Sequence, residues 1–171
     1  MKYLVIMIFS ISSLFAFGDS IQSFQANFVQ KITDEEDKVL TYEGKIHSKR
    51  PNFVLWHYTK PINKKIYINN KRAVIVEPEL EQAIIKQLKG EIDFFGILAS
   101  AVSVDMTHYK ASYKGIGFIL KEVNGVIESL SYTDQLENKV LITFSKQKQN
   151  RPLEDELFTP KVPKDFDIIQ E

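Results

Sequence analysis

Few residues in this chain have the types and spacing that catalysis or metal binding requires. The chain has three histidines, His47, His57 and His108, and no cysteine, so a zinc site would need these histidines together with a carboxylate. Because the hydrophobic pattern places them on different strands, we interpret them as solvated or strand-face side chains. The sequence also lacks Gly-x-Ser-x-Gly, Walker and Gly-x-Gly-x-x-Gly motifs. We therefore predict that the protein is not an enzyme and uses no metal or cofactor.

One cation is notable for its position: the arginine of KRPNFVLWHYTKP at residues 49–61. Side-chain alternation from Leu40 through Ile46 places Arg50 on the inward face of its strand. Pro51 restricts Arg50 to extended conformations. A buried guanidinium needs acceptors for its five donors, and carbonyls at a helix end or in a loop would supply them. From these residues alone, Arg50 is either a latch between sheet and helix or a rim arginine paired with a carboxylate.

The elements that must position this arginine are strands, because apolar and polar residues alternate over most of the chain. This period of two predicts a meander of roughly nine or ten antiparallel strands. The pairs Asn69-Asn70 and Asn124-Gly125 are tight-turn signals, and a longer hairpin is expected between Tyr132 and Val140. The stretch 53–59 is apolar on both faces. Prolines leave the C-terminal segment irregular, with at most an edge strand.

The segment from Glu91 to Ser103 breaks this period. Its apolar residues recur at spacings of three and four, the pattern of an amphipathic helix, and the stripe consists of Phe94, Ile97, Leu98 and Ala101. Gly96 weakens such a helix by about 1 kcal/mol relative to alanine, so packing must hold it. We predict an α+β fold, mostly antiparallel β, in which this helix covers one face or one mouth of a curved sheet.

The first 18 residues are typical of an export signal, with one lysine, a continuous apolar run and the small-x-small triplet Ala16-Phe17-Gly18. We predict that residues 1–18 are a signal peptide and that residues 19–171 form one exported domain. No later segment approaches the roughly 20 apolar residues of a membrane-spanning helix. The formal net charge of +0 argues against nucleic acid as a partner. Without disulfides, stability must come from a sizeable core.

Several of these stretches resemble one known family. SFQANFVQKIT at 23–33, Gly44 and above all KRPNFVLWHYTKP are similar to the outer-membrane lipoprotein carrier protein (LolA) family, and EQAIIKQL and LFTPKVP follow in the same order. The resemblance implies an incomplete (half) β-barrel, curled around an apolar cavity and closed by a helical lid. It also implies a periplasmic chaperone that carries acylated lipoproteins from an inner-membrane ABC transporter to an outer-membrane acceptor.

The resemblance also suggests roles for particular residues. The family's Lys-Arg-Pro arginine, which bonds to the lid, matches Arg50, and its tryptophan matches Trp56. The residues that we expect to bind the acyl chains are the inward-facing ones: Phe24, Phe28, Ile32, Leu40, Tyr42, Ile46, Val54, Trp56 and Tyr58. Those expected to form the lid are Phe94, Ile97, Leu98 and Ala101. For each of these side chains, ordinary core packing is the alternative.

The chain departs from the family pattern in two places. The family has an amphipathic helix before the Ser-Phe strand, whereas here only residues 19–22 precede Ser23, so lid closure is expected to depend on the helix at 91–103. The region between Ile116 and Phe144 is also one strand short. We expect a monomer that acts as a carrier. A periplasmic sensor of lipids or lipoproteins with the same fold, or a lipid hydrolase, are the alternatives.

Overall fold

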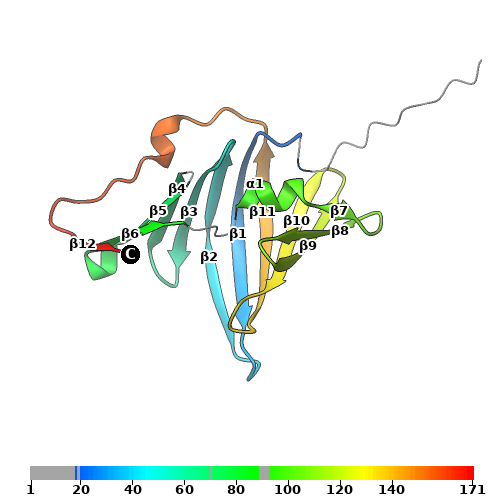
Figure 1. Ribbon diagram of the computed structural model, residues 1–171, viewed down its shortest axis with the longest axis horizontal. Helices are drawn as coiled ribbons and strands as arrows, with labels where there is room; N and C mark the ends of the chain where they lie inside the picture. The colour runs from blue at the N-terminus through cyan, green and yellow to red at the C-terminus, as the bar shows by residue number, and fades with distance from the viewer. Residues whose placement is uncertain (1–17, 19, 70, 89–92) are drawn as a thin grey trace, which may run out of the picture.

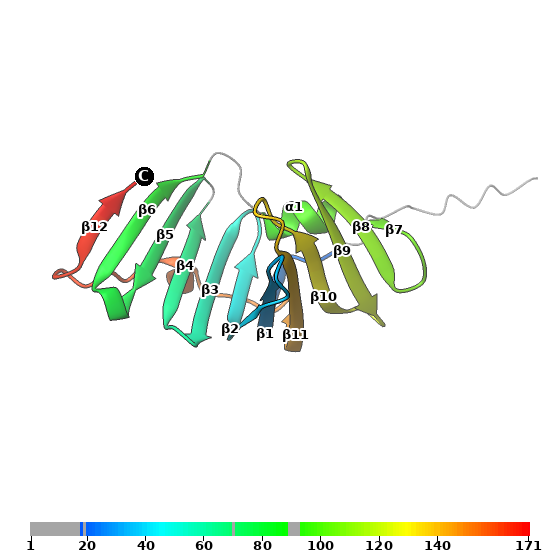
Figure 2. The ribbon, with the colours of Figure 1, turned by 90° about the horizontal axis from the view of Figure 1, so that it is seen from below.

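The computed structural model describes residues 18, 20–69, 71–88 and 93–171. In these residues a single sheet of 12 strands runs in the order β12-β6-β5-β4-β3-β2-β1-β11-β10-β9-β8-β7 (Figures 1 and 2). The strands are β1 (Ser23–Thr33), β2 (Val39–Lys49), β3 (Phe53–Lys60), β4 (Lys64–Asn69), β5 (Arg72–Glu77), β6 (Gln82–Gln87), β7 (Val102–Ser103), β8 (His108–Tyr113), β9 (Ile116–Val123), β10 (Val126–Thr133), β11 (Lys139–Gln149) and β12 (Asp167–Gln170). The only other regular elements in the described part of the chain are one α-helix, α1 (Phe94–Ala99), and two 3₁₀ turns, η1 (Pro78–Leu80) and η2 (Asp155–Phe158).

The sheet is open, and strand β1 lies near its middle. β1 pairs with β2 on one side and with β11 on the other, and all neighbouring strands are antiparallel except β12, which pairs parallel to β6. The predicted mostly antiparallel meander is therefore confirmed. The expected strand number was too low, because β7 has two residues and β12 has four, and strands this short show little period. The C-terminal edge strand was also expected.

The tight turns lie where the sequence predicted them. At the β9–β10 turn, Asn124 has φ 53° and Gly125 has φ 80°, which is the left-handed backbone that this hairpin type requires. Val123 pairs with Val126 across it. β4 and β5 also form the expected hairpin, whose Asn70 lies outside the described residues.

Two apolar cores cover opposite faces of the sheet. The larger core joins the inward side chains of β1, β2 and β8–β11 to α1, which crosses this face in Figure 1. The smaller core joins the outward side chains of β3–β5 to the segment after β11, which runs back to β12. β3 contributes Val54 to the first core and Leu55 to the second. This double burial explains why residues 53–59 are apolar on both faces.

The helix is shorter than the sequence predicted. Asp93 caps its N-terminus by accepting a hydrogen bond from the Phe95 amide at 3.0 Å. The helix ends at Ala99, because Val102 and Ser103 pair with β8 instead of continuing the helical stripe. Residues 91–92 of the expected helix lie outside the described residues. The helix expected over residues 91–103 is thus corrected to a helix of six residues.

Gly96 also has a packing role that the sequence did not indicate. A Cβ atom at this position would lie 2.4 Å from Cε2 of Tyr113, so the missing side chain lets the Tyr113 ring of β8 pack directly on the helix. The glycine lowers helix propensity but permits the contact that holds α1 against the sheet.

Candidate functional site

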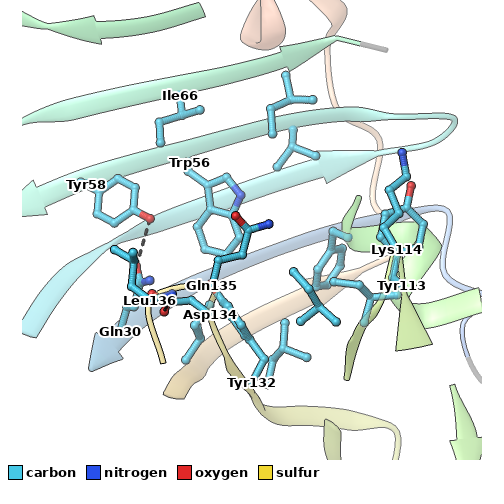
Figure 3. Close-up of a pocket in the computed structure, with 17 residues that line it drawn as sticks. Gln30, Trp56, Tyr58, Ile66, Tyr113, Lys114, Tyr132, Asp134, Gln135 and Leu136 are labelled. Atoms are coloured by element: carbon cyan, nitrogen blue, oxygen red, sulfur yellow. Dashed lines mark hydrogen bonds between the residues drawn. The ribbon is translucent and has the colours of Figure 1, made fainter. Parts of the chain in front are cut away.

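A cavity of about 650 Å³ lies on the inner face of the sheet, beside α1. Its wall is mostly apolar and combines strands from both halves of the sheet with the helix (Figure 3). The residues that line it are Gln30, Val54, Trp56, Tyr58, Ile66, Ile68, Phe94, Ile97, Tyr113, Lys114, Ile116, Leu130, Tyr132, Asp134, Gln135, Leu136 and Ile142. The lining strands β3 and β4 lie on one side of β1 and the lining strands β8–β11 on the other, so the cavity spans the inner face over the centre of the sheet.

Aromatic side chains from β3 form one wall and pack edge to face on a buried ring behind them. The Phe28 ring centre lies 5.0 Å from that of Trp56 and 5.1 Å from that of Tyr58. Phe28 is only 2% exposed, and it supports both rings from the core. Trp56 and Tyr58 are half-buried and present their remaining surface to the cavity.

The one polar pair on this wall is internally satisfied. The Tyr58 hydroxyl donates a hydrogen bond to Oε1 of Gln30 at 3.0 Å, shown as a dashed line in Figure 3. Burial raises the pKa of Tyr58 far above its usual value, and Tyr132 and Tyr42 nearby add to the effect, so the phenol stays neutral. The wall therefore offers apolar contact and no charge at this point.

The opposite wall comes from the β10–β11 hairpin and the β8–β9 turn. Tyr132 and the turn residues Asp134, Gln135 and Leu136 approach the Trp56 side, and Tyr113 and Lys114 lie at the other end (Figure 3). Hydrogen bonds close the base of the turn, where Oδ1 of Asp134 accepts from the amides of Leu136 and Asn138 at 2.8 and 2.9 Å. Leu136 is 77% exposed, so this wall presents an apolar side chain at the rim.

The structure divides the nine side chains predicted to bind acyl chains into groups. Val54, Trp56 and Tyr58 line the cavity. The others do not line it: Phe24, Phe28 and Ile46 are buried in the core, Ile32 packs against that core, Tyr42 stacks edge to face on Tyr58 at 5.8 Å, and Leu40 is exposed. Alternation predicted correctly which face of the sheet each side chain lies on, but it does not show how deeply the side chain is buried.

Leu40 lies apart from the cavity. It pairs with Ile32 near the far end of the β1–β2 hairpin, which extends beyond the neighbouring strands in Figure 1. No described element covers this end of the inner face, and the side chain is 60% exposed. Leu40 faces the predicted side of the sheet but lies outside the cavity.

The predicted lid residues divide in the same way. Phe94 and Ile97 line the cavity, whereas Leu98 and Ala101 are buried in the core, 0% and 6% exposed. The Phe94 ring lies 5.0 Å from Phe24 and thereby fixes α1 over β1. The short helix contributes one wall of the cavity rather than a cover over it.

Several lining residues were missed by sequence analysis. They are Ile66 and Ile68 of β4, Ile116 of β9, Leu130 and Tyr132 of β10, Ile142 of β11 and the turn residues of the opposite wall. Alternation within β4 and β10 contained the signal for the strand residues. No local pattern indicates that the turn at 134–136 reaches across the hollow, because this depends on the curvature of the sheet.

Arg50 points inward, as alternation predicted, and its partners are carbonyl oxygens. Its Nε donates to the Ile21 oxygen and its Nη2 to the Gly18 oxygen, each at 2.9 Å. The guanidinium also lies over the Phe95 ring of α1, 4.8 Å from its centre. Within the described residues Arg50 forms no ion pair with a carboxylate, so the rim alternative finds no support in this part of the chain.

A second clamp on the same segment comes from Asn150, which sequence analysis did not single out. Its side chain accepts from the Gln22 amide at 2.7 Å and donates to the Ser20 oxygen at 3.1 Å. Its own amide donates to the Ser23 oxygen at 2.9 Å. Arg50 and Asn150 together bind the backbone that leads into β1.

The three histidines do not form one site: His47 and His57 lie on the paired strands β2 and β3, whereas His108 lies on β8. Burial lowers the pKa of His47 and His57, with Lys45 and Lys65 adding to the effect, and His108 is bonded to Asp105 at 3.0 Å. Among the described residues, no three metal-ligating side chains form a cluster. In the same part of the chain, no helix has the length and hydrophobicity needed to cross a bilayer.

Comparison with known proteins identifies the family. The family model described as "Outer membrane lipoprotein carrier protein LolA" matches residues 19–114. Two proteins named outer-membrane lipoprotein carrier protein are similar to this chain over most of their length. The one from Wolinella succinogenes is 36% identical over 90% of this chain and 90% of its own, and the one from Helicobacter pylori strain HPAG1 is 40% identical over 88% of this chain and 82% of its own. A namesake from Campylobacter jejuni is 34% identical over 98% of both chains. The chain belongs to the outer membrane lipoprotein carrier protein (LolA) family.

Solved structures with the same fold are more distant in sequence. A LolA superfamily protein from Nitrosomonas europaea superposes with a TM-score of 0.51 at 15% identity, covering 82% of this chain and 91% of that one. An uncharacterized conserved protein from Thermus thermophilus superposes with a TM-score of 0.57 at 11% identity, covering 91% and 94%. These likenesses show the open-sheet fold.

Proposed function

We propose that this protein is a periplasmic carrier of acylated lipoproteins and that it shelters their acyl chains in the cavity beside Trp56. The observation that carries the proposal is the apolar wall of this cavity in a chain of the lipoprotein carrier family. The relatives that match over most of their length are named lipoprotein carriers. The chain would receive its cargo from an inner-membrane ABC transporter and deliver it to an outer-membrane acceptor, acting as a monomer.

The size of the cavity limits how the cargo is held. A cavity of about 650 Å³ is within the range of pockets that enclose one small ligand. Burying one acyl chain of about 16 carbons gains on the order of 12 kcal/mol, at roughly 0.8 kcal/mol per methylene. A lipoprotein with several chains therefore needs the walls to move apart. The two walls that can separate without breaking the sheet are α1 and the turn at 134–136.

Arg50 is placed to control the first of these movements. Its bonds to the Gly18 and Ile21 carbonyls and its contact with Phe95 connect the sheet, the N-terminal segment and α1. Breaking these contacts would free the helix that carries Phe94 and Ile97. We propose that this arginine is the lid latch and that it acts on the short helix α1 instead of a larger lid.

Mass spectrometry of the protein released from its own periplasm without detergent tests this function. The proposal predicts co-isolated polypeptide that carries acyl chains at its N-terminus. The variant Ile66→Asp, which places a charge in the cavity, should be isolated without it. Free lipid in place of acylated polypeptide would favour a lipid-binding or sensing role, and no bound lipid in the parent protein would contradict the carrier.

A further inference from the structure

A second pocket, of about 320 Å³, lies on the outer face of the sheet. The residues that line it are Tyr67, Asn69, Arg72, Val74, Ile85, Phe158, Pro160 and Val162. Its floor is a row of paired residues, Tyr67 of β4, Val74 of β5 and Ile85 of β6. Tyr67 lies between Ile66 and Ile68, which line the cavity, so the two hollows are on opposite faces of the same strand.

The segment after β11 forms the wall of this pocket. Phe158, Pro160 and Val162 alternate with exposed residues, so an extended chain turns these three side chains toward the sheet. Phe158 is 2% exposed, and Val162 packs against the smaller core. The Tyr67 hydroxyl is hydrogen-bonded to the backbone of Lys161, which ties the segment to β4. The pocket is therefore built by the packing of the C-terminal segment on the sheet.

Arg72 brings a positive charge to the rim of this apolar pocket. It is exposed and lies two residues before Val74 on β5, so both side chains are on the outer face. Within the described residues Arg72 forms no ion pair, and no described lining residue is a carboxylate. Lys161, by contrast, is paired with Glu156 at 2.9 Å. Asn69, the cross-strand partner of Arg72, adds an amide to the same rim.

We propose that this pocket binds a small amphipathic carboxylate, an apolar group about the size of an aromatic ring that carries one carboxylate. A pocket of this size, mostly apolar with a few polar groups, is typical of small-ligand sites. A guanidinium offers a carboxylate two parallel N–H donors. One unpaired cation matches one negative charge better than the nearly two charges of a phosphate monoester. Because pocket and cavity lie on opposite faces, this inference does not depend on the proposed cargo.

Methyl NMR spectra recorded during titration with phenylpropionate test the site. The signals of Val74, Ile85 and Val162 should shift to saturation, whereas those of Ile66 and Ile142, which line the cavity, should not. Phenylpropanol has the same apolar body without the charge, and it should bind about fivefold more weakly, as expected for the loss of one well-formed exposed ion pair. Equal binding of the acid and the alcohol would overturn the proposal. Unshifted signals at the three pocket residues would do so as well.

Arg72→Gln should remove the preference for the acid. Its affinity for phenylpropionate should fall about fivefold, to that of phenylpropanol, while its affinity for the alcohol stays that of the parent. Arg72 is exposed, so the variant should keep the parent thermal midpoint. Arg151→Gln is the matched control, because it makes the same change at an exposed arginine outside the pocket. A parent-like preference in Arg72→Gln would contradict the assigned role of the guanidinium.

A free acid and the C-terminal residue of a peptide share this chemistry. A short peptide that ends in phenylalanine, compared with its C-terminal amide, separates the two sources. Tighter binding of the peptide acid than of phenylpropionate would support the site and assign it to the chain end of a partner. Weaker binding of the peptide acid, but still tighter than its amide, would support the site and assign it to a free acid. Equal binding of the peptide acid and its amide would refute recognition of a carboxylate.

Discussion

The guanidinium of Arg50 lies 4.8 Å from the centre of the Phe95 ring, with the cation over the face of the aromatic group. Phe95 is only 1% exposed and belongs to α1, the helix that also carries Phe94 and Ile97 into the cavity. One side chain from the end of β2 is therefore in contact with the helix and, through two hydrogen bonds, with the N-terminal segment. Movement of the helix relative to the sheet must break this contact.

Arg50→Leu should leave the sheet folded and weaken the hold on α1. The variant loses two charge-assisted hydrogen bonds and a cation–π contact, and we expect a loss of roughly 1–3 kcal/mol in the free energy of unfolding. Transfer of a fluorescent lipopeptide to acceptor vesicles should change its rate several-fold. Arg50→Lys is the control: it keeps the charge but cannot donate to two carbonyls in a planar fork. Parent transfer rates in Arg50→Leu would rule out the latch.

Ile66→Asp should reduce acyl-chain affinity at least tenfold, because an unpaired carboxylate in an apolar cavity is costly to cover with lipid. Ile66 lines the cavity from β4. The neighbouring Lys65 lies on the opposite face of the same strand, so Lys65→Asp is a matched control with the same new side chain. Titration with an acylated peptide measures both variants. Equal affinities would mean that the lipid binds elsewhere.

Gly96→Ala tests the contact between α1 and β8. The added Cβ would lie 2.4 Å from Tyr113, and such overpacking costs about 1–3 kcal/mol. With Tyr113→Ala as background the clash with the ring is gone, leaving only the approach to Oδ2 of Asp93 at 3.1 Å, and the same substitution should stabilise the helix by up to about 1 kcal/mol. Denaturant unfolding of the parent, the two single variants and the double variant gives the coupling free energy between residues 96 and 113. Identical effects in both backgrounds would show that the ring does not restrict residue 96.

Phe158→Ala should destabilise the outer face of the sheet without changing the cavity. Phe158 is 2% exposed in the smaller core and lies 5.8 Å from Phe53, ring centre to ring centre. Truncation of a buried phenylalanine costs about 3–5 kcal/mol. Hydrogen exchange should increase in the segment between β11 and β12, while acyl-peptide affinity below the unfolding temperature should remain that of the parent. A weakened affinity would mean that the two faces are coupled.

The sequence predicted the strands, the hairpin turns and the inward direction of Arg50, because each depends on local alternation or turn chemistry. It did not predict how deep a side chain lies. Phe28 and Leu40 share one face of the sheet, yet one is 2% and the other 60% exposed, because only the curvature of the sheet and the place of α1 decide what is covered. The alternation of apolar and polar residues contains no information about the curvature of the sheet or the place of α1.

Two close glycine contacts were not predicted from the sequence. Gly96 lies against Tyr113 and Gly18 against Leu98, and a Cβ atom at either glycine would lie 2.4 Å from its neighbour. These contacts join residues distant in sequence. The helical stripe from Phe94 to Ala101 was real, but the pairing of β7 with β8 ended the helix earlier, so tertiary pairing overrode the local pattern.

The central claim is that acyl chains occupy the cavity beside Trp56, and the fluorescence of this residue tests it most directly. Trp56 is the only tryptophan of the chain and lines the cavity. Titration with a lipopeptide whose acyl chains carry bromine should quench its emission strongly and to saturation, because quenching requires contact with the bromine. The same peptide without acyl chains is the control and should have no effect. Saturable binding of the brominated lipopeptide with undiminished Trp56 emission would contradict the claim.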